Sequence, residues 1–101
     1  MASVRWTPQA SDDLEAIVEY IALDSDYYAR LFASKILAAI DRLEIFPNRG
    51  RIVPEINNPL IREIFMGNYR IVYRCRDEVV EILTIYHGAR LLDPSGFESL
   101  S

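Results

Sequence analysis

The apolar residues of the N-terminal half recur at the spacing of α-helices. Through residues 8–23 one stripe of four apolar positions, three or four residues apart, comprises Ala10, Leu14, Ile17 and Ile21. Thr7 is a good N-cap, and Pro8 at the first helical position loses no donor that the helix needs. The pattern therefore predicts an amphipathic helix over residues 8–23.

A second helical pattern follows after a break of three polar residues, 24–26. Its apolar stripe, over residues 27–46, consists of Phe32, Ile36, Ala39 or Ile40, and Leu43. Pro47 and Gly50 end this helix. Because the connection is so short, we expect the two helices to form an antiparallel hairpin.

The C-terminal half changes to β-rich runs separated by turn residues. Residues 60–66, Tyr69–Arg76 and Val79–His87 read as three strands joined by turns at Gly67-Asn68 and Asp77-Glu78. Residues 4–6 read as a short first strand, 47–59 as an ordered loop and 88–101 as irregular chain. The sequence thus predicts one α+β domain over residues 1–101: an N-terminal strand, then an antiparallel helical hairpin packed on a small antiparallel sheet that ends in a three-stranded meander.

The Asp77-Glu78 turn also predicts a register, in which facing residues have numbers that sum to 155. One sheet face would then carry Tyr69, Ile71, Tyr73, Cys75, Val80, Ile82, Thr84 and Tyr86. The other would carry Arg70, Val72, Arg74, Glu81, Leu83, Ile85 and His87. Cationic and titratable groups would share the second face with apolar residues, although a slip of one residue would reassign every position.

Composition excludes several classes of protein. The chain has 101 residues with one cysteine and one histidine, so it offers neither an internal disulfide nor a structural zinc site, and no cofactor is expected. No apolar run approaches the roughly 20 residues of a membrane span. We expect a cytoplasmic protein with no membrane partner. A net charge of −4 also makes it a poor general binder of nucleic acid, although residues 51–90 are rich in arginine.

At GNYRIVYR and VVEILTIYHGAR the chain resembles the RelE/ParE superfamily of bacterial toxins. The resemblance extends to the opening VRWTPQASDDLEAIVEYIA and to the long second helix ending at Phe46-Pro47. It implies the toxin of a type II toxin–antitoxin system, neutralised by a cognate antitoxin encoded beside it, in a homodimer or a toxin–antitoxin heterotetramer. The two amphipathic helices and the sheet carry more apolar surface than a chain of this size easily buries, which agrees with a surface that binds a partner.

The superfamily resemblance implies two possible targets. ParE-like members inhibit DNA gyrase without being nucleases. RelE-like and YoeB-like members cut mRNA on the ribosome, and their catalytic residues match Arg70, Arg90, His87 and, more loosely, Glu55. Such cleavage needs a base, an acid and cations at the phosphate.

Departures from the nuclease pattern favour the ParE-like branch. Gly88 stands where an aromatic residue would follow His87, and Lys35 is the only lysine. The structural alternatives are an exposed Arg70 paired with Glu63 or Glu81, and a packed or capping His87. A third possibility is a non-toxic family member kept only to bind antitoxin.

Overall fold

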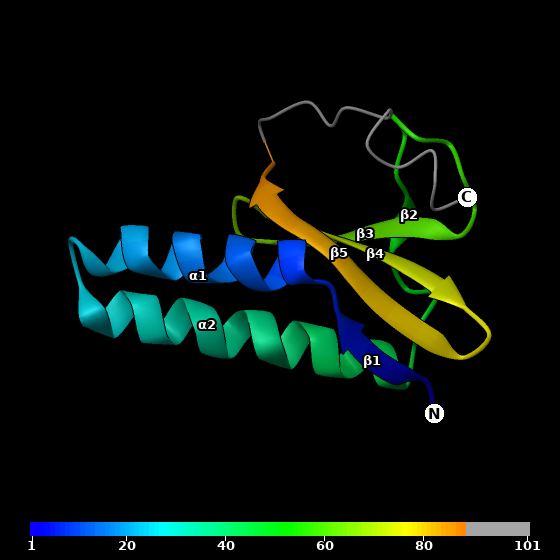
Figure 1. The fold of residues 1–101 in the computed structure, drawn as a ribbon, viewed down its shortest axis with the longest axis horizontal. Coiled ribbons are helices and arrows are strands. Elements are labelled where there is room, and N and C mark those ends of the chain that lie inside the picture. Colours follow the sequence, from blue (N-terminus) through cyan, green and yellow to red (C-terminus); the bar gives the residue numbers. More distant parts are fainter. Residues whose placement is uncertain (89–101) are drawn as a thin grey trace.

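The structure is a computed structural model that describes residues 1–88. A five-stranded mixed sheet with strand order β1-β5-β4-β3-β2 carries two helices on one face (Figure 1). The elements are β1 Ser3–Trp6, α1 Pro8–Ala22, α2 Asp26–Asp41, the 3-10 helix η1 Arg42–Glu44, β2 Arg51–Ile52, β3 Ile61–Met66, β4 Tyr69–Arg76 and β5 Val79–His87.

The predicted α+β architecture is confirmed, with three differences. Strand β1 joins the sheet by pairing in parallel with β5, so the sheet is mixed and not antiparallel. The second helix ends at Asp41, earlier than expected, and continues as η1. Residues 51–52, predicted as loop, pair with β3 as the short strand β2. A parallel β1 is possible because the whole helical hairpin lies between the paired strands and provides the long connection that parallel pairing needs.

Each helix begins at a side-chain cap. The hydroxyl of Thr7 accepts a hydrogen bond from Ala10 N at 3.1 Å and donates to the carbonyl of Ile82 at 2.8 Å. Ser25 accepts from Tyr28 N at 3.2 Å and starts α2. Thr7 therefore fixes the start of α1 to β5 as well as capping the helix.

The main core lies between the hairpin and the sheet. Ile36, Ala39, Ile40 and Leu43 of the second helical segment are buried there, as their spacing predicts, and Leu14 and Ile17 of α1 pack against them. The sheet contributes Ile64, Ile71, Tyr73, Val80, Ile82 and Ile85. Within residues 1–88, no helix has the length and apolar character needed to cross a membrane.

A β-bulge divides the β4–β5 hairpin into two registers. The predicted pairing is confirmed from Tyr73↔Ile82 to the Asp77-Glu78 turn, whose residues have φ of 52° and 61°. It is wrong beyond the bulge, where Arg70 pairs with Tyr86 and not with Ile85. The extra residue of β5 shifts every later position, as a bulge does.

Because of the bulge, the side chains at the end of β5 lie on the sheet faces opposite to those predicted. Ile85 joins the helix-covered core, whereas Tyr86 packs in the apolar cluster on the opposite face. The ring of His87 lies 5.4 Å from that of Tyr69, which itself packs against the helix-side core. The expectation that His87 shares a face with Arg70 is therefore wrong.

Asp13 of α1 holds the bulge from the helix side. Its Oδ2 accepts a hydrogen bond from Ile85 N at 3.1 Å and another from the hydroxyl of Thr84. A carboxylate thus satisfies a backbone N–H of β5 that lies beyond Ile82, the last residue paired with β1.

Candidate functional site

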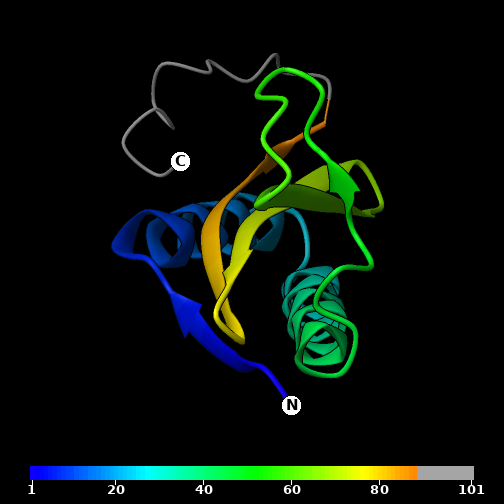
Figure 2. The ribbon, with the colours of Figure 1, turned by 90° about the vertical axis from the view of Figure 1, so that its right-hand side faces the viewer.

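The sheet face away from the helices bears a second, smaller apolar cluster with two charged residues buried beside it. The cluster consists of Val53, Ile61, Val72, Leu83 and Tyr86, with Ile56 packed against it. Glu63 is 1% exposed and Arg70 is 5% exposed. Figure 2 shows the segment between β2 and β3 on the other side of the sheet from α2. Buried charges of this kind require partners, because an isolated charge in an apolar region is strongly unfavourable.

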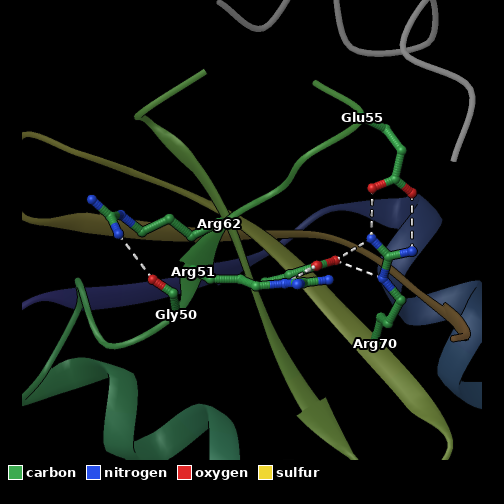
Figure 3. Close-up of polar contacts among 6 residues, drawn as sticks. Gly50, Arg51, Glu55, Arg62 and Arg70 are labelled. Carbon is green, nitrogen blue, oxygen red and sulfur yellow. Dashed lines mark hydrogen bonds and ion pairs between the residues drawn. The ribbon is translucent and has the colours of Figure 1, made fainter. Parts of the chain in front are cut away.

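Arg70 has two carboxylates as partners. Its Nε donates to Glu63 Oε1 at 2.6 Å, and its Nη1 and Nη2 donate to the two carboxylate oxygens of Glu55 at 3.0 and 3.1 Å (Figure 3). Burial by itself would lower the pKa of Arg70, but its hydrogen bonds to Glu55 and Glu63 raise that pKa above the ordinary value. The bidentate pairing of Arg70 with Glu55 fixes the relative geometry of the two side chains.

Glu63 connects this pair to the edge of the sheet. Its second oxygen, Oε2, accepts from Arg51 Nε of β2 at 2.7 Å. The neighbouring Arg62 donates from Nη1 to the carbonyl of Gly50 at 2.9 Å (Figure 3). These contacts attach β2 and the segment that follows it to β3 and β4. We call Arg51, Glu55, Glu63 and Arg70 the charge cluster.

Aromatic rings border the charge cluster. The guanidinium carbon of Arg70 lies 5.0 Å from the Tyr86 ring centroid, and that of Arg51 lies 5.0 Å from the Phe65 ring. Burial raises the pKa of Tyr86 to about 12, although the charge of Arg70 opposes this shift. The rings add cation–π attraction to both guanidinium groups, of which that of Arg70 is buried and that of Arg51 is exposed.

The structure brings together two of the four residues that sequence analysis placed in a possible nuclease site. Arg70 and Glu55 are in direct contact, whereas His87 is exposed at the helix-side surface of β5. Arg90 lies outside the described residues. The pairing of Arg70 with Glu63 was one of the expected structural alternatives, but the expectation that Arg70 is exposed is wrong, because it is buried. Glu81 pairs with Arg74 at 2.8 Å.

Arg51 and the central position of Glu63 were not predicted from the sequence. One signal was present: in the strand IREIFM, alternation places Glu63 on the same face as the apolar residues Ile61 and Phe65. A carboxylate at an inward position predicts a cationic partner. In this arrangement the hydrogen-bonding edges of the Arg70 guanidinium are directed at carboxylates of the same chain. No group of three or more candidate metal ligands occurs within residues 1–88.

A separate apolar pocket of about 340 Å³ lies between the helical hairpin and the β3–β4 turn. Tyr28, Leu31 and Phe32 of α2 line one side, and Met66 and Tyr69 line the other. Tyr28 is 62% exposed and Leu31 is 37% exposed. The apolar surplus seen in the sequence therefore appears partly as exposed surface on the helix side.

Comparison with known proteins gives consistent matches. The family described as "ParE toxin of type II toxin-antitoxin system, parDE" matches residues 4–92. The protein named Toxin RelE2 of Caulobacter vibrioides is 37% identical over 91 residues, which are 90% of this chain and all of that relative.

Solved structures from toxin–antitoxin systems share the fold. A chain from the chromosomal ParDE toxin–antitoxin system of P. aeruginosa has a TM-score of 0.71 at 26% identity, covering 86% of this chain and 96% of that one. A chain from the toxin–antitoxin complex RelBE2 of Mycobacterium tuberculosis has a TM-score of 0.59 at 26% identity, covering 85% of this chain and 96% of that one.

Proposed function

The chain belongs to the ParE toxin family of type II toxin–antitoxin systems, within the RelE/ParE superfamily, and from this we propose that it inhibits DNA gyrase without cleaving nucleic acid. We further propose that residues 1–101 act as one cytoplasmic toxin domain that a cognate antitoxin neutralises. Both solved relatives come from toxin–antitoxin systems, which supports such a partner.

The non-enzymatic part of the proposal rests on the pairing of Arg70 with two carboxylates. A catalytic arginine must present its guanidinium to the phosphate, yet that of Arg70 is directed at Glu55 and Glu63. Freeing it would leave the fully buried carboxylate of Glu63 with one partner fewer. Breaking a buried pair of this kind costs about 3–5 kcal/mol. The geometry therefore favours a structural role for Arg70.

The other nuclease candidates support the same conclusion. Glu55 would have to release its two hydrogen bonds to Arg70 before acting as a base. His87 lies on the opposite sheet face from Arg70, so the two cannot act together on one phosphate without rearrangement. The net charge of −4 also provides little attraction to ribosomal RNA.

The second candidate function is a ribosome-dependent mRNA endoribonuclease. A relative with 37% identity bears the name Toxin RelE2, and one solved relative comes from a RelBE2 complex. In this case Arg70, Arg90 and His87 would act on the phosphate and Glu55 would serve as base.

Inducible expression separates the two functions. We expect growth arrest with an SOS response, gyrase-linked DNA breaks and intact mRNA, together with inhibition of purified gyrase by the purified chain. Codon-phased mRNA cleavage with intact DNA would overturn the gyrase proposal, and stable expression without arrest would contradict a toxic function.

His87→Gln sharpens the experiment because it removes a titratable group from outside the charge cluster. We expect its gyrase inhibition to equal that of the unchanged chain. A nuclease that uses His87 as acid would lose about 10²–10⁴-fold in cleavage rate. Tyr20→Phe, at an exposed position of α1, is the matched control for an exposed ring substitution.

A further inference from the structure

Strand β1 leaves half of its backbone groups without a partner strand. Within residues 1–88, β1 is an end strand and pairs only with β5. Ser3 N donates to Glu78 O at 2.9 Å, and Thr7 N donates to Ile82 O at 3.1 Å. In a parallel ladder alternate residues bond to the same neighbour, so the N–H and C=O groups of Val4 and Trp6 point away from β5. The outer edge of β1 can therefore accept another strand.

The edge is held rigidly at both ends. Ala2, which is buried, donates its N–H to the carbonyl of Glu44 at 2.8 Å. Thr7 caps α1 and binds the carbonyl of Ile82. A partner strand would meet an edge already in strand conformation, which lowers the entropy lost on binding.

On the sheet face away from the helices, this edge is bordered by cations. A pocket of about 250 Å³ is lined by Arg5, Arg74, Arg76 and Val79, with the carboxylates of Asp77 and Glu81. Arg74 engages Glu81 at 2.8 Å, and Arg76 lies 3.6 Å from Asp77. Arg5, on β1 itself, makes no ion pair with any of the residues 1–88 and is exposed. The pocket thus has one cation more than it has anions.

On the helix-covered face, the same edge is bordered by an apolar groove. Trp6 of β1 faces this side, because its register partner Ile82 belongs to the helix-side core. The groove, of about 320 Å³, runs from Trp6 to Leu14 and Val18 of α1 and Leu37 of α2, and Ser11 and Glu15 also line it. Leu37 is 46% exposed. The two sides of the β1 edge therefore differ in chemistry: one is cationic and the other is apolar.

We propose that the outer edge of β1 binds an extended segment of the antitoxin as a sixth strand, with acidic side chains toward Arg5 and aliphatic side chains toward Trp6 and Leu37. Successive side chains of a strand point to opposite faces, so an alternating acidic–aliphatic sequence matches both sides. Backbone hydrogen bonds to Val4 and Trp6 provide affinity, and the two side-chain environments provide specificity. Only the identity of the protein that carries the segment rests on the proposed function.

A fluorescent octapeptide with the sequence Glu-Val-Glu-Leu-Glu-Val-Glu-Leu is a suitable probe. We expect saturable binding to the full chain in fluorescence anisotropy. Two control peptides, one with the four glutamates in a block and one with lysine in place of glutamate, should bind at least about tenfold more weakly. Equal binding of the block peptide would overturn the requirement for alternation.

Substitutions on each side of the edge test the two environments separately. Arg5→Glu should weaken binding of the alternating peptide about tenfold, whereas Arg30→Glu, at an exposed position of α2, should not. Leu37→Glu should weaken it by a similar factor, and Leu23→Glu, which is 83% exposed at the hairpin tip, should not. Equal effects of test and control variants would contradict this placement.

Amide hydrogen exchange followed by NMR reports the pairing itself. We expect the amides of Val4 and Trp6 to exchange rapidly in the free chain and to become protected with the peptide, while those of Ser3 and Thr7 are protected in both states. Binding without protection of Val4 and Trp6 would overturn strand addition. If these amides become protected when only the concentration of the chain is raised, and sedimentation shows a dimer, then the added strand comes from a second copy of this chain and not from the antitoxin.

The outcome is independent of the gyrase assay, which uses the unchanged chain without peptide. A chain that binds the peptide but leaves gyrase active would overturn the proposed function and keep the binding site. A chain that inhibits gyrase but does not bind the alternating peptide would overturn the binding site and keep the proposed function. Neutralisation by the cognate antitoxin that persists in Arg5→Glu and Leu37→Glu would also refute the assignment to the antitoxin.

Discussion

The two faces of the sheet are stabilised in different ways. On the helix side, apolar side chains from two helices and four strands pack into one continuous core. On the other side, a small apolar cluster is completed by Arg51, Glu55, Glu63 and Arg70. Packing by apolar area is non-directional and tolerates adjustment, whereas charge-assisted hydrogen bonds demand fixed positions. The face without helices therefore relies on directional contacts to hold a segment that has little secondary structure.

The largest effect is expected from removing the shared carboxylate of the charge cluster. Glu63→Ala leaves Arg70 buried with only Glu55, and we expect the free energy of unfolding to fall by about 3–5 kcal/mol in urea denaturation. Glu81→Ala is the control, because its pair with Arg74 is partly exposed and should contribute about 0.2–1 kcal/mol.

A double variant tests whether charge or shape stabilises this face. Glu63→Leu with Arg70→Met replaces the buried pair by apolar groups, and we expect it to recover most of the stability that Glu63→Ala loses. A double variant as unstable as Glu63→Ala would show that the cluster contributes net attraction beyond filling space.

The helix side should respond to lost volume instead. Leu43 is fully buried in the main core, and Leu43→Ala should lower the free energy of unfolding by about 2–5 kcal/mol, from lost transfer energy and the cavity that remains. Leu23→Ala, at the exposed hairpin tip, should change it by less than about 0.5 kcal/mol. An equally small loss of unfolding free energy in both variants would mean that the surrounding core closes the cavity left by the shortened Leu43 side chain.

A smaller effect is expected where the helix-side core meets the loop after η1. Gly50 N donates to the hydroxyl of Tyr73 at 2.9 Å, inside the protein. Tyr73→Phe leaves this N–H unpaired and should cost about 1–3 kcal/mol. A side chain at Gly50 would be more disruptive, because its Cβ would lie 2.6 Å from the Tyr73 hydroxyl. Tyr20→Phe is the exposed control, and equal stability of the two variants would contradict a role for the hydrogen bond.

The smallest effect at neutral pH is expected for Tyr86→Phe. The Tyr86 hydroxyl is buried without a hydrogen-bond partner among residues 1–88, so its loss should change stability by less than about 0.5 kcal/mol. Between pH 10 and about 12, however, the unfolded chain loses the Tyr86 proton while the folded chain keeps it. Stability of the unchanged chain should therefore fall as pH rises through this window, and Tyr86→Phe should reduce the slope. Identical alkaline slopes would refute the raised pKa.

The elements were predictable from local signals. Strands β4 and β5 were predicted with their observed bounds because β-branched and aromatic runs flank a two-residue turn, Asp77-Glu78. The helices were predicted from their apolar stripes and, for α1, from Thr7, which supplies the cap. Local chemistry decides such features, so one sequence is enough to find them.

The bulge and the charge cluster were not predictable in the same way. Nothing in Leu83-Thr84-Ile85 marks an extra residue, since alternation continues and neither glycine nor proline is present. The bulge is supported by Asp13, which is distant in sequence. Glu55 and Arg70 were both singled out, but their contact depends on how the segment before β3 folds back. Long-range geometry, which composition does not encode, determines both features.

The pairing of β1 with β5 has a consequence for the newly made chain. Thr7 and its hydrogen-bond acceptor Leu83 are 76 residues apart, so the first strand has no partner until β5 has been synthesised. At about 5–20 residues per second, β1 waits on the order of 4–15 s on the ribosome. The helical hairpin can form in that interval, but the sheet and its outer edge exist only once β5 has been synthesised. A product truncated before β5 would therefore lack the β1 edge, and an antitoxin that recognises this edge would distinguish it from chains that contain β5.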